Sequence, residues 1–275
     1  MLLCGDVFDR LCEIPPTSVQ CVVTSPPYYK LRKYDTSGYE IGQEGTDAEY
    51  VELLATVGDL LEVVLLPTGT LYLNIGDSYG DHGLRLLPCR VALEMQNRGW
   101  YVQSDIIWRK TRYMPNGGTS RPVLIHEYVL MLTRVRSGHY YNADAVREPH
   151  SPISLKRWEA SEVAALGAPH SMGHKKADGG YRTKKVIPNP LGKLKTSVWD
   201  ICPSNYKGKH FAVMPVQLAE TCILASSRPG DTVLDPFCGS GTTGVAALRH
   251  GREFIGIDSN PEAIVLAEAR IDSGR

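Results

Sequence analysis

A glycine-rich turn near the C-terminus constrains the fold of this chain more than any other feature. The turn follows a short apolar run over 232–234 and reads Asp235-Pro236-Phe237-Cys238-Gly239-Ser240-Gly241-Thr242-Thr243-Gly244. Glycines at G-x-G-x-x-G spacing between a strand and a helix let the backbone approach a ligand, and the helix N-terminus favours an anionic group. Asp258 follows Gly239 by 19 residues, at the end of the next predicted strand, where a carboxylate can accept both ribose hydroxyls. The pattern predicts a site for a nucleoside-bearing cofactor, with a turn that serves only helix packing as the alternative.

Strand and helix patterns alternate over most of the remaining chain. Short β-branched or apolar runs predict strands over 1–4, 19–23, 70–75, 100–108, 127–133, 232–234 and 254–257. Helical spacing of apolar residues predicts helices over 7–13, 47–66, 86–98, 217–226, 242–250 and 261–271. This alternation is typical of an α/β fold in which helices cover both faces of a mainly parallel sheet.

The alternation stops between residues 137 and 208, where prolines and glycines accumulate and one helix is expected over about 154–166. Residues 101–209 carry 18 Lys and Arg against 8 Asp and Glu, although the whole chain has a net charge of zero. A local basic surplus is expected of a segment that contacts a polyanion, and a solvated lysine-rich loop is the alternative. We therefore predict a domain formed by 1–136 and 209–275, with an inserted basic region over 137–208.

Composition narrows the cellular setting. The chain has 275 residues, enough for one large α/β domain with an insertion, and it contains no apolar run of 18 residues. Its seven cysteines form no C-x-x-C pair, and the His170-x-x-x-His174 spacing has no nearby cysteine or acidic partner. We expect a cytoplasmic protein with no membrane segment, no disulfide and no metal site.

A second motif, Thr24-Ser25-Pro26-Pro27-Tyr28-Tyr29, ends the predicted strand 19–23. Each proline fixes its own φ and holds the residue before it extended, so we expect the Ser25 hydroxyl and the Pro26 carbonyl to point outward. Two hydrogen-bond acceptors beside the Tyr28 ring would suit a planar amine. A proline turn that merely ends the strand is the alternative interpretation.

Together the two motifs resemble those of the amino-group DNA methyltransferases. Asp235 to Thr243 is similar to the cofactor motif of that family, and Ser25 to Tyr28 to its catalytic motif. The catalytic motif comes first here, which is the permuted order of the beta group, and the resemblance covers most of 1–136 and 196–275. It implies the Rossmann-like fold of S-adenosylmethionine-dependent methyltransferases, with a seven-stranded sheet containing one reversed strand, and a target-recognition role for the insertion.

The resemblance also implies roles for individual residues. The catalytic turn would be formed by Ser25, Pro26, Pro27 and Tyr28. In it, the Ser25 hydroxyl and the Pro26 carbonyl would hold the amine toward the sulfonium methyl group, and Tyr28 would stack on a base extruded from the duplex. S-Adenosyl-L-methionine would be bound by Asp258 at the ribose, Asp6 at the adenine amine, Phe237 by apolar packing, and Asp235, Gly239, Gly241 and Thr242 around the methionine part.

The implied reaction is methylation of the N4 amine of a flipped cytosine in a short duplex DNA sequence, because Ser-Pro-Pro-Tyr is usual for cytosine. Asp-Pro-Pro-Tyr is usual for adenine N6, which remains the enzymatic alternative. A nicotinamide-dependent oxidoreductase and a non-catalytic DNA-binding module are alternatives from other classes. The expected partner is double-stranded DNA, and the sequence leaves open a cognate restriction endonuclease and both a monomer and a homodimer.

Overall fold

The computed structural model of the protein describes the chain except for residues 32–40, 114–119, 159–187, 205–213 and 275. The described residues form two compact units. The larger unit comprises Met1–Asn142 and Thr196–Arg275, and the smaller comprises Ala143–Lys195. The smaller unit lies within the predicted 137–208 insertion and is shorter than it at both ends.

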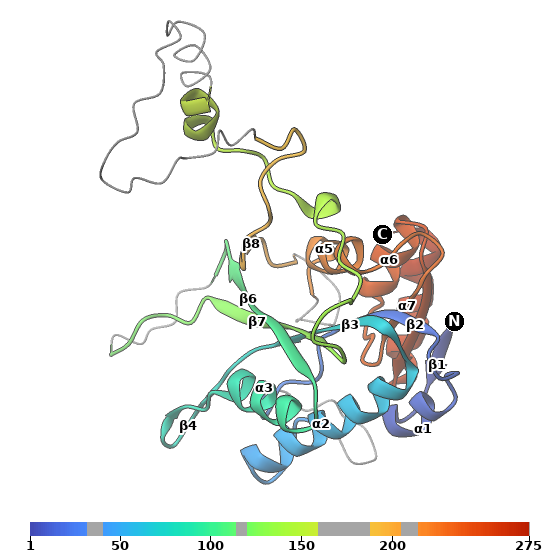
Figure 1. The fold of residues 1–275 in the computed structure, drawn as a ribbon. Helices are drawn as coiled ribbons and strands as arrows, with labels where there is room; N and C mark the ends of the chain where they lie inside the picture. The colour runs from blue at the N-terminus through green and yellow to red at the C-terminus, as the bar shows by residue number, and fades with distance from the viewer. Residues whose placement is uncertain (32–40, 114–119, 159–187, 205–213, 275) are drawn as a thin grey trace, which may run out of the picture. The chain divides into compact units, whose positions relative to one another are not determined.

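One mixed sheet forms the centre of the larger unit, in the order β1-β10-β9-β2-β3-β7-β6-β8 (Figure 1). Its strands are β1 Leu2–Cys4, β2 Val19–Thr24, β3 Leu65–Ile75, β6 Tyr101–Lys110, β7 His126–Thr133, β8 Val198–Ile201, β9 Thr232–Asp235 and β10 Glu253–Asp258. Only β7 runs against its neighbours, and every other pairing in this sheet that does not involve β7 is parallel. The expected single reversed strand is therefore present.

The expected strand count of seven is wrong, because Val198–Ile201 adds an eighth strand at the sheet edge. This strand pairs in parallel with β6, and Trp108 lies opposite Trp199 in the register. The Trp108 indole Nε1 donates to the Ile201 carbonyl at 2.9 Å, and both tryptophans are buried. A four-residue strand with two exposed positions is too short to show a clear pattern in the sequence.

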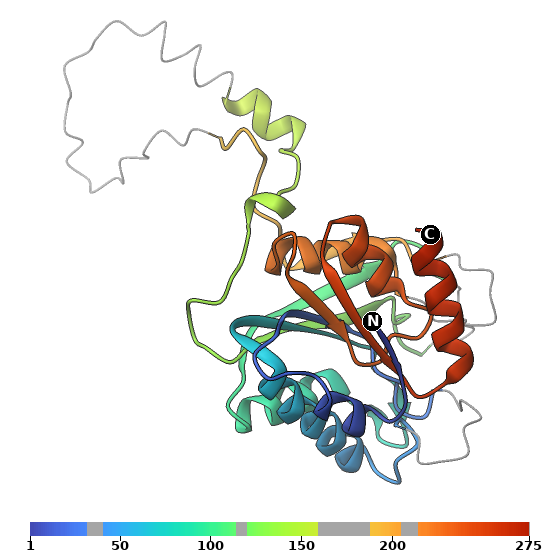
Figure 2. The same cartoon turned by 90° about the vertical axis from the view of Figure 1, so that its right-hand side faces the viewer.

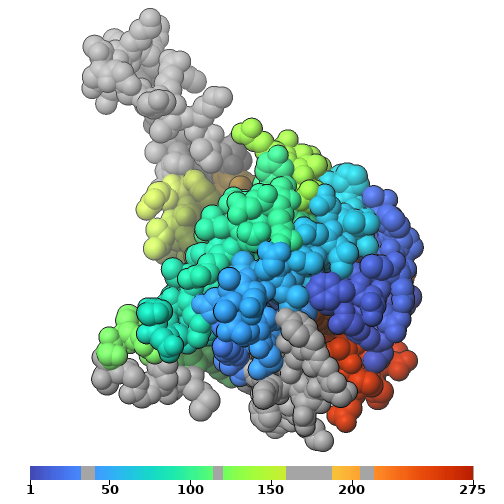
Figure 3. Space-filling view, turned by 90° about the horizontal axis from the view of Figure 1, so that it is seen from below, coloured from blue at the N-terminus to red at the C-terminus, as the bar shows by residue number. Residues whose placement is uncertain are grey.

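Helices cover both faces of the sheet, as predicted (Figures 1 and 2). On one face lie α1 Val7–Cys12, α2 Asp47–Val64 and α3 Leu87–Asn97, whose buried side chains share one core with β2, β3 and β7. Figure 3 looks onto this face, with α1 in dark blue, α2 in lighter blue and α3 in green. On the other face lie α5 Val216–Ser226, α6 Thr242–Arg249 and α7 Pro261–Ser273, which pack on a second core. Among the described residues, no helix is both long and apolar enough to cross a membrane.

Local sequence signals set several helix boundaries. A capping box starts α2: Thr46 Oγ1 accepts from the Glu49 backbone N–H, and the Glu49 side chain accepts from the Thr46 N–H. Asn260 caps α7, and Pro261 occupies its first turn. The helix predicted over 47–66 ends at Val64 because Leu65 already pairs with Val19 of β2. A short hairpin of β4 Tyr79–Gly80 and β5 Gly83–Leu84 follows β3.

The smaller unit contains the 3-10 turn η1 Asp144–Val146, a helical segment over 152–158, and an antiparallel bridge between Glu148 and Lys193. The helix predicted over 154–166 is described only as far as residue 158. The His170 and His174 pair lies outside the described residues.

Candidate active site

The predicted site residues gather along the edge of the sheet that is formed by the carboxyl ends of its parallel strands. The parallel strands β1, β10, β9, β2 and β3 all end there, and the reversed strand β7 begins there. In open α/β sheets, ligands bind in the crevice outside the carboxyl ends of the strands. Strand β2, which leads into the Ser25 turn, is paired directly with β9, which leads into the glycine-rich turn. Two motifs about 200 residues apart in the sequence therefore begin on neighbouring strands.

The Asp235 carboxylate joins these two turns. Its Oδ1 accepts from Thr24 Oγ1 at 2.6 Å and from the Phe237 backbone N–H at 3.1 Å, and its Oδ2 accepts from Thr243 Oγ1 at 2.7 Å. The side chain is buried, with 3% of its surface exposed. These three hydrogen bonds hold the end of β2 against the start of α6, and a contact of Asp235 with the methionine part of the cofactor remains a prediction.

Because Asp235 is buried, the unfolding free energy of the protein should depend on pH through this carboxyl group. Burial raises the pKa of this carboxyl to about 6, although the Thr24 and Thr243 hydrogen bonds oppose the shift. An unfolded aspartate has a pKa near 3.9, so between about pH 4 and 6 the folded state binds more protons, and stability falls as the pH rises through that window. When the pH is raised from about 5 to about 7.5, the unfolding free energy of the wild type should fall by about 1 kcal/mol more than that of Asp235→Asn, which has no carboxyl group at this position to titrate. Urea denaturation at both pH values measures this difference, and the exposed Asp272→Asn serves as the control. Equal pH slopes for the wild type and Asp235→Asn would contradict the prediction.

The glycine-rich turn is fixed by Asp258 from the neighbouring strand. Asp258 Oδ2 accepts from the Gly239 N–H at 2.8 Å, and Oδ1 accepts from the Asn260 N–H at 2.9 Å. Gly239 and Gly241 both have positive φ angles, 48° and 77°. A Cβ on Gly241 would lie 2.9 Å from the Ala267 Cβ of α7, whereas a Cβ on Gly239 would meet no described protein atom within 4 Å beyond its two neighbours in the chain. The two glycines therefore serve different needs, one for helix packing and one for open space above the turn.

This edge of the sheet fits an adenosyl group, the part of the cofactor that carries most of its hydrogen-bonding atoms. Cys4 of β1 pairs with Asp258 of β10, so the Asp6 and Asp258 carboxylates follow adjacent strand ends. Asp6 is exposed and caps α1 by accepting from the Phe8 N–H at 2.8 Å, and Asp258 and Phe237 are half-buried. Carboxylate acceptors beside an open glycine turn and a partly exposed aromatic ring match ribose hydroxyls, an adenine amine and a purine face. Asp6, Phe237, Gly239 and Asp258 would hold the group.

Thr242 links the glycine-rich turn to α7. It is the first residue of α6, it is buried, and its hydroxyl accepts from Arg270 Nη1 of α7 at 3.3 Å. The same guanidinium donates to the Ser240 carbonyl at 2.7 Å and to the Ser240 hydroxyl. Through these contacts α7 supports the back of the glycine-rich turn. A role of Thr242 beside the methionine part remains a prediction.

The second motif forms a proline turn beyond β2. The Pro27 carbonyl accepts from the Tyr50 hydroxyl at 2.9 Å, which ties the turn to α2. The Pro26 carbonyl has no hydrogen-bond donor among the described residues, and Ser25 is half-buried. Pro27 thus anchors the turn through its carbonyl, while the Ser25 hydroxyl and the Pro26 carbonyl are the two oxygens that we predicted to accept from an amine.

Tyr28 enters a polar cluster at the same edge. Its hydroxyl donates to Glu127 Oε2 of β7 at 2.5 Å and accepts from Ser25 Oγ at 3.2 Å and from Asn74 Nδ2 of β3 at 2.9 Å. Asn74 Nδ2 also donates to Glu127 Oε2 at 3.0 Å, and Lys110 of β6 forms an ion pair with Glu127 Oε1 at 2.5 Å. Burial and the neighbouring Glu127 raise the pKa of the Tyr28 hydroxyl well above its ordinary value, so it stays protonated. Side chains from three strands therefore surround the Ser25 turn.

Gly76 lets the Tyr28 ring lie close to the end of β3. A Cβ at this position would come within 2.7 Å of Tyr28 Cε2. The ring is half-buried, and its hydroxyl end is fixed by Glu127 and Asn74. Stacking of Tyr28 on an extruded base remains a prediction.

Sequence reasoning missed Thr24, Asn74, Lys110, Glu127 and Thr243 as members of the site. Asn74 and Glu127 are buried polar residues at the ends of otherwise apolar strands, with 2% and 9% of their surfaces exposed. A polar residue at the end of a buried run is a usable signal, because buried polar groups require partners. For Glu127 the signal depends on knowing that β7 is reversed, since only then does the start of this strand lie at this edge.

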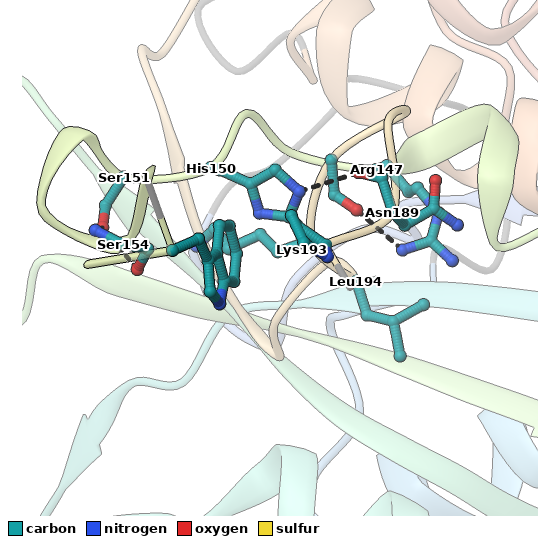
Figure 4. Close-up of a pocket in the computed structure, with 10 residues that line it drawn as sticks. Arg147, His150, Ser151, Ser154, Asn189, Lys193 and Leu194 are labelled. Atoms are coloured by element: carbon teal, nitrogen blue, oxygen red, sulfur yellow. Dashed lines mark hydrogen bonds between the residues drawn. The ribbon is translucent and has the colours of Figure 1, made fainter. Parts of the chain in front are cut away.

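The smaller unit has a cavity of its own, with a volume of about 640 Å³ (Figure 4). The His150 imidazole Nε2 contacts the Asn189 carbonyl oxygen at 2.8 Å, and its ring meets Trp158 edge-on at 4.7 Å between centroids. Arg147 donates to the Gly192 carbonyl at 2.8 Å. The lining comprises Arg147, His150, Ser151, Ser154, Trp158, Pro188, Asn189, Gly192, Lys193 and Leu194. Cationic and aromatic side chains together are typical of nucleic-acid contacts.

A family model described as DNA methylase matches residues 19–269 of the chain. The chain belongs to this DNA methylase family. The type II methyltransferase M.Cfr9I of Citrobacter freundii is 34% identical to it over 296 residues, an alignment that covers 97% of this chain and 86% of the relative. The family predicted from the two motifs is thus confirmed, and the oxidoreductase alternative is removed.

Solved structures confirm the predicted fold class of this DNA methylase. The PvuII DNA methyltransferase, named cytosine-N4-specific, superposes with a TM-score of 0.70 at 20% identity, covering 98% of this chain and 85% of that one. A protein from Thermus thermophilus, solved in complex with S-adenosyl-L-methionine, gives a TM-score of 0.64 at 24% identity and covers 99% and 93%. At these identities the likeness concerns the fold.

Proposed function

We propose that this DNA methylase transfers a methyl group from S-adenosyl-L-methionine to the N4 amine of a cytosine flipped out of a short duplex sequence. The observation that carries the proposal is the 2.6 Å hydrogen bond from Thr24 to Asp235, which holds the Ser25 turn beside the glycine-rich turn. S-Adenosyl-L-methionine supplies an electrophilic methyl group when bound. Asp6 and Asp258 would hold its adenosine, and the Ser25 hydroxyl and the Pro26 carbonyl would orient the target amine by accepting its two hydrogens.

Ser25 supports cytosine as the target base. The serine stands where adenine enzymes usually carry aspartate, and a solved neighbour of the same fold is named cytosine-N4-specific. Double-stranded DNA as the partner is supported by the basic surplus over 101–209 and by the cationic and aromatic lining of the cavity in the smaller unit. A companion restriction endonuclease, the intracellular location and the choice between monomer and homodimer remain predictions.

The decisive experiment is methylation of unmethylated plasmid DNA by the purified protein with S-adenosyl-L-methionine. Digestion to nucleosides and mass spectrometry should detect N4-methylcytosine, and single-molecule sequencing should locate it in one short sequence context. N6-Methyladenine without N4-methylcytosine would overturn the choice of base and leave the enzyme class intact. No methylated base on DNA from several sources would overturn the proposal itself.

A further inference from the structure

A serine that accepts a hydrogen bond from an amine must direct its own hydroxyl hydrogen elsewhere. An amine carries two hydrogens, and a hydroxyl hydrogen pointing at it would set donor against donor. A carboxylate at this position would have no such hydrogen, because an ionised carboxylate only accepts. Ser25 therefore needs a partner that accepts its hydrogen on the side away from the substrate.

The polar cluster supplies that partner in a fixed order. Glu127 forms an ion pair with Lys110 at 2.5 Å, and the carboxylate of an ion pair only accepts, so the Tyr28 hydroxyl donates in their 2.5 Å contact. With its single hydrogen committed, the Tyr28 oxygen can only accept from Ser25, at 3.2 Å. The Asn74 amide also donates to the Tyr28 oxygen at 2.9 Å and, at the longer distance of 3.4 Å, to Ser25 Oγ, which leaves a second Ser25 lone pair for the target amine. The directions of all these hydrogen bonds follow from the one charged acceptor.

We infer that Glu127 is a positioning residue for methyl transfer, which acts through the Tyr28 hydroxyl to turn the Ser25 lone pairs toward the target amine. This inference rests on the proposed function. Tyr28 then has a second role besides the predicted stacking, which is to accept the hydrogen of the Ser25 hydroxyl. This role requires the Tyr28 hydroxyl, whereas stacking requires only the ring. Glu127 is 9% exposed at the second position of β7, and its described side-chain contacts are with Tyr28, Asn74 and Lys110, so its described link to Ser25 runs through Tyr28 and Asn74.

The test is a double-mutant cycle of Tyr28→Phe and Glu127→Gln. Tyr28→Phe keeps the aromatic ring and removes the hydroxyl that links Ser25 to Glu127. In Glu127→Gln, Lys110 favours the amide oxygen, so the amide nitrogen faces Tyr28. This nitrogen would donate to the Tyr28 hydroxyl, which reverses the direction of the hydrogen bonds from Ser25 through Tyr28 to residue 127. We expect each variant to lower the single-turnover methylation rate at saturating DNA and cofactor by about 10-fold or more, as for a lost hydrogen bond to a charged group. The double variant should be no slower than the slower single variant, because both changes break one chain.

Controls separate positioning from damage to the fold. Dissociation constants for S-adenosyl-L-methionine and for DNA, and the thermal unfolding midpoint, should stay close to the wild-type values. Glu62→Gln is the matched control, since Glu62 also forms a 2.5 Å ion pair, with Arg134, and lies near the C-terminus of α2, outside the described contacts of the Tyr28 cluster.

Two results would overturn the inference. One is a Tyr28→Phe enzyme with the wild-type rate, since the ring alone would then suffice. The other is a double variant whose loss equals the product of the single losses, which indicates independent effects. Both are read against a wild type that methylates DNA. A wild type that transfers no methyl group to DNA would instead refute the proposed function.

Discussion

Replacing Ser25 by alanine is expected to lower the rate of methyl transfer to DNA by about 100-fold or more, the loss typical when one oriented hydrogen-bonding group is removed from a reacting centre. The alanine cannot accept from the target amine, and the Pro26 carbonyl alone does not fix the direction of its nitrogen. Thr24, Asp235 and the glycine-rich turn are untouched, so cofactor binding should persist. Single-turnover transfer of a labelled methyl group, with calorimetric titration of S-adenosyl-L-methionine, measures both quantities.

Ser18→Ala provides the control, because Ser18 lies just before β2, at the opposite end of the strand, and its hydroxyl donates to the Pro15 carbonyl. We expect it to methylate DNA at the wild-type rate. DNA binding should survive in Ser25→Ala, which separates chemistry from docking. If Ser25→Ala methylated DNA as fast as Ser18→Ala, the proline turn would merely end the strand, and the acceptor role would have to move elsewhere.

The fold was largely predictable because its signals are local. Buried strands such as Val19–Thr24 are largely apolar runs, and a capping box at Thr46 and Glu49 marks the N-terminus of α2. The start of β3 was not predictable, because Pro67 and Gly69 lie within the strand and only its pairing with β2 extends it to Leu65. The edge strand β8 depends in the same way on a partner, since Trp199 lies opposite Trp108 of β6.

The candidate site was predictable only where its residues form a contiguous motif. The Ser25 turn and the glycine-rich turn each carry their chemistry within a few residues, so their spacing is informative. The Tyr28 cluster draws single residues from β3, β6 and β7, and no spacing links Asn74, Lys110 and Glu127. Asp235 shows a further limit, because the motif that contains it was found, whereas the hydrogen bonds that its carboxylate accepts from Thr24, Thr243 and Phe237 were not predicted. Which atoms of a motif face the ligand depends on contacts that the sequence does not contain.

Gly239 and Gly241 of the glycine-rich turn should respond differently to replacement by alanine, Gly241 mainly by a loss of stability and Gly239 mainly by weaker cofactor binding. Gly241→Ala places a methyl group 2.9 Å from the Ala267 Cβ and 3.0 Å from its Cα, both on α7, at a φ of 77°. The helix must shift or the turn must change, so we expect a loss of about 3 kcal/mol or more of unfolding free energy, from overpacking and left-handed strain together. Urea denaturation measures it.

Gly239→Ala is the matched variant, since it adds the same methyl group to the same turn where no described protein atom lies within 4 Å. Its φ of 48° falls in the left-handed region that alanine adopts at a cost of about 1–2 kcal/mol, so the loss of stability should be smaller. The methyl group would, however, fill the open space above the turn where the cofactor is proposed to lie. We therefore expect Gly239→Ala to weaken S-adenosyl-L-methionine binding by at least about 10-fold, as expected for about 1.4 kcal/mol of binding free energy. If a stable Gly239→Ala protein bound the cofactor as tightly as the wild type, the cofactor would have to lie elsewhere on this edge. A ligand held against the Gly239 backbone would clash with a methyl group added there.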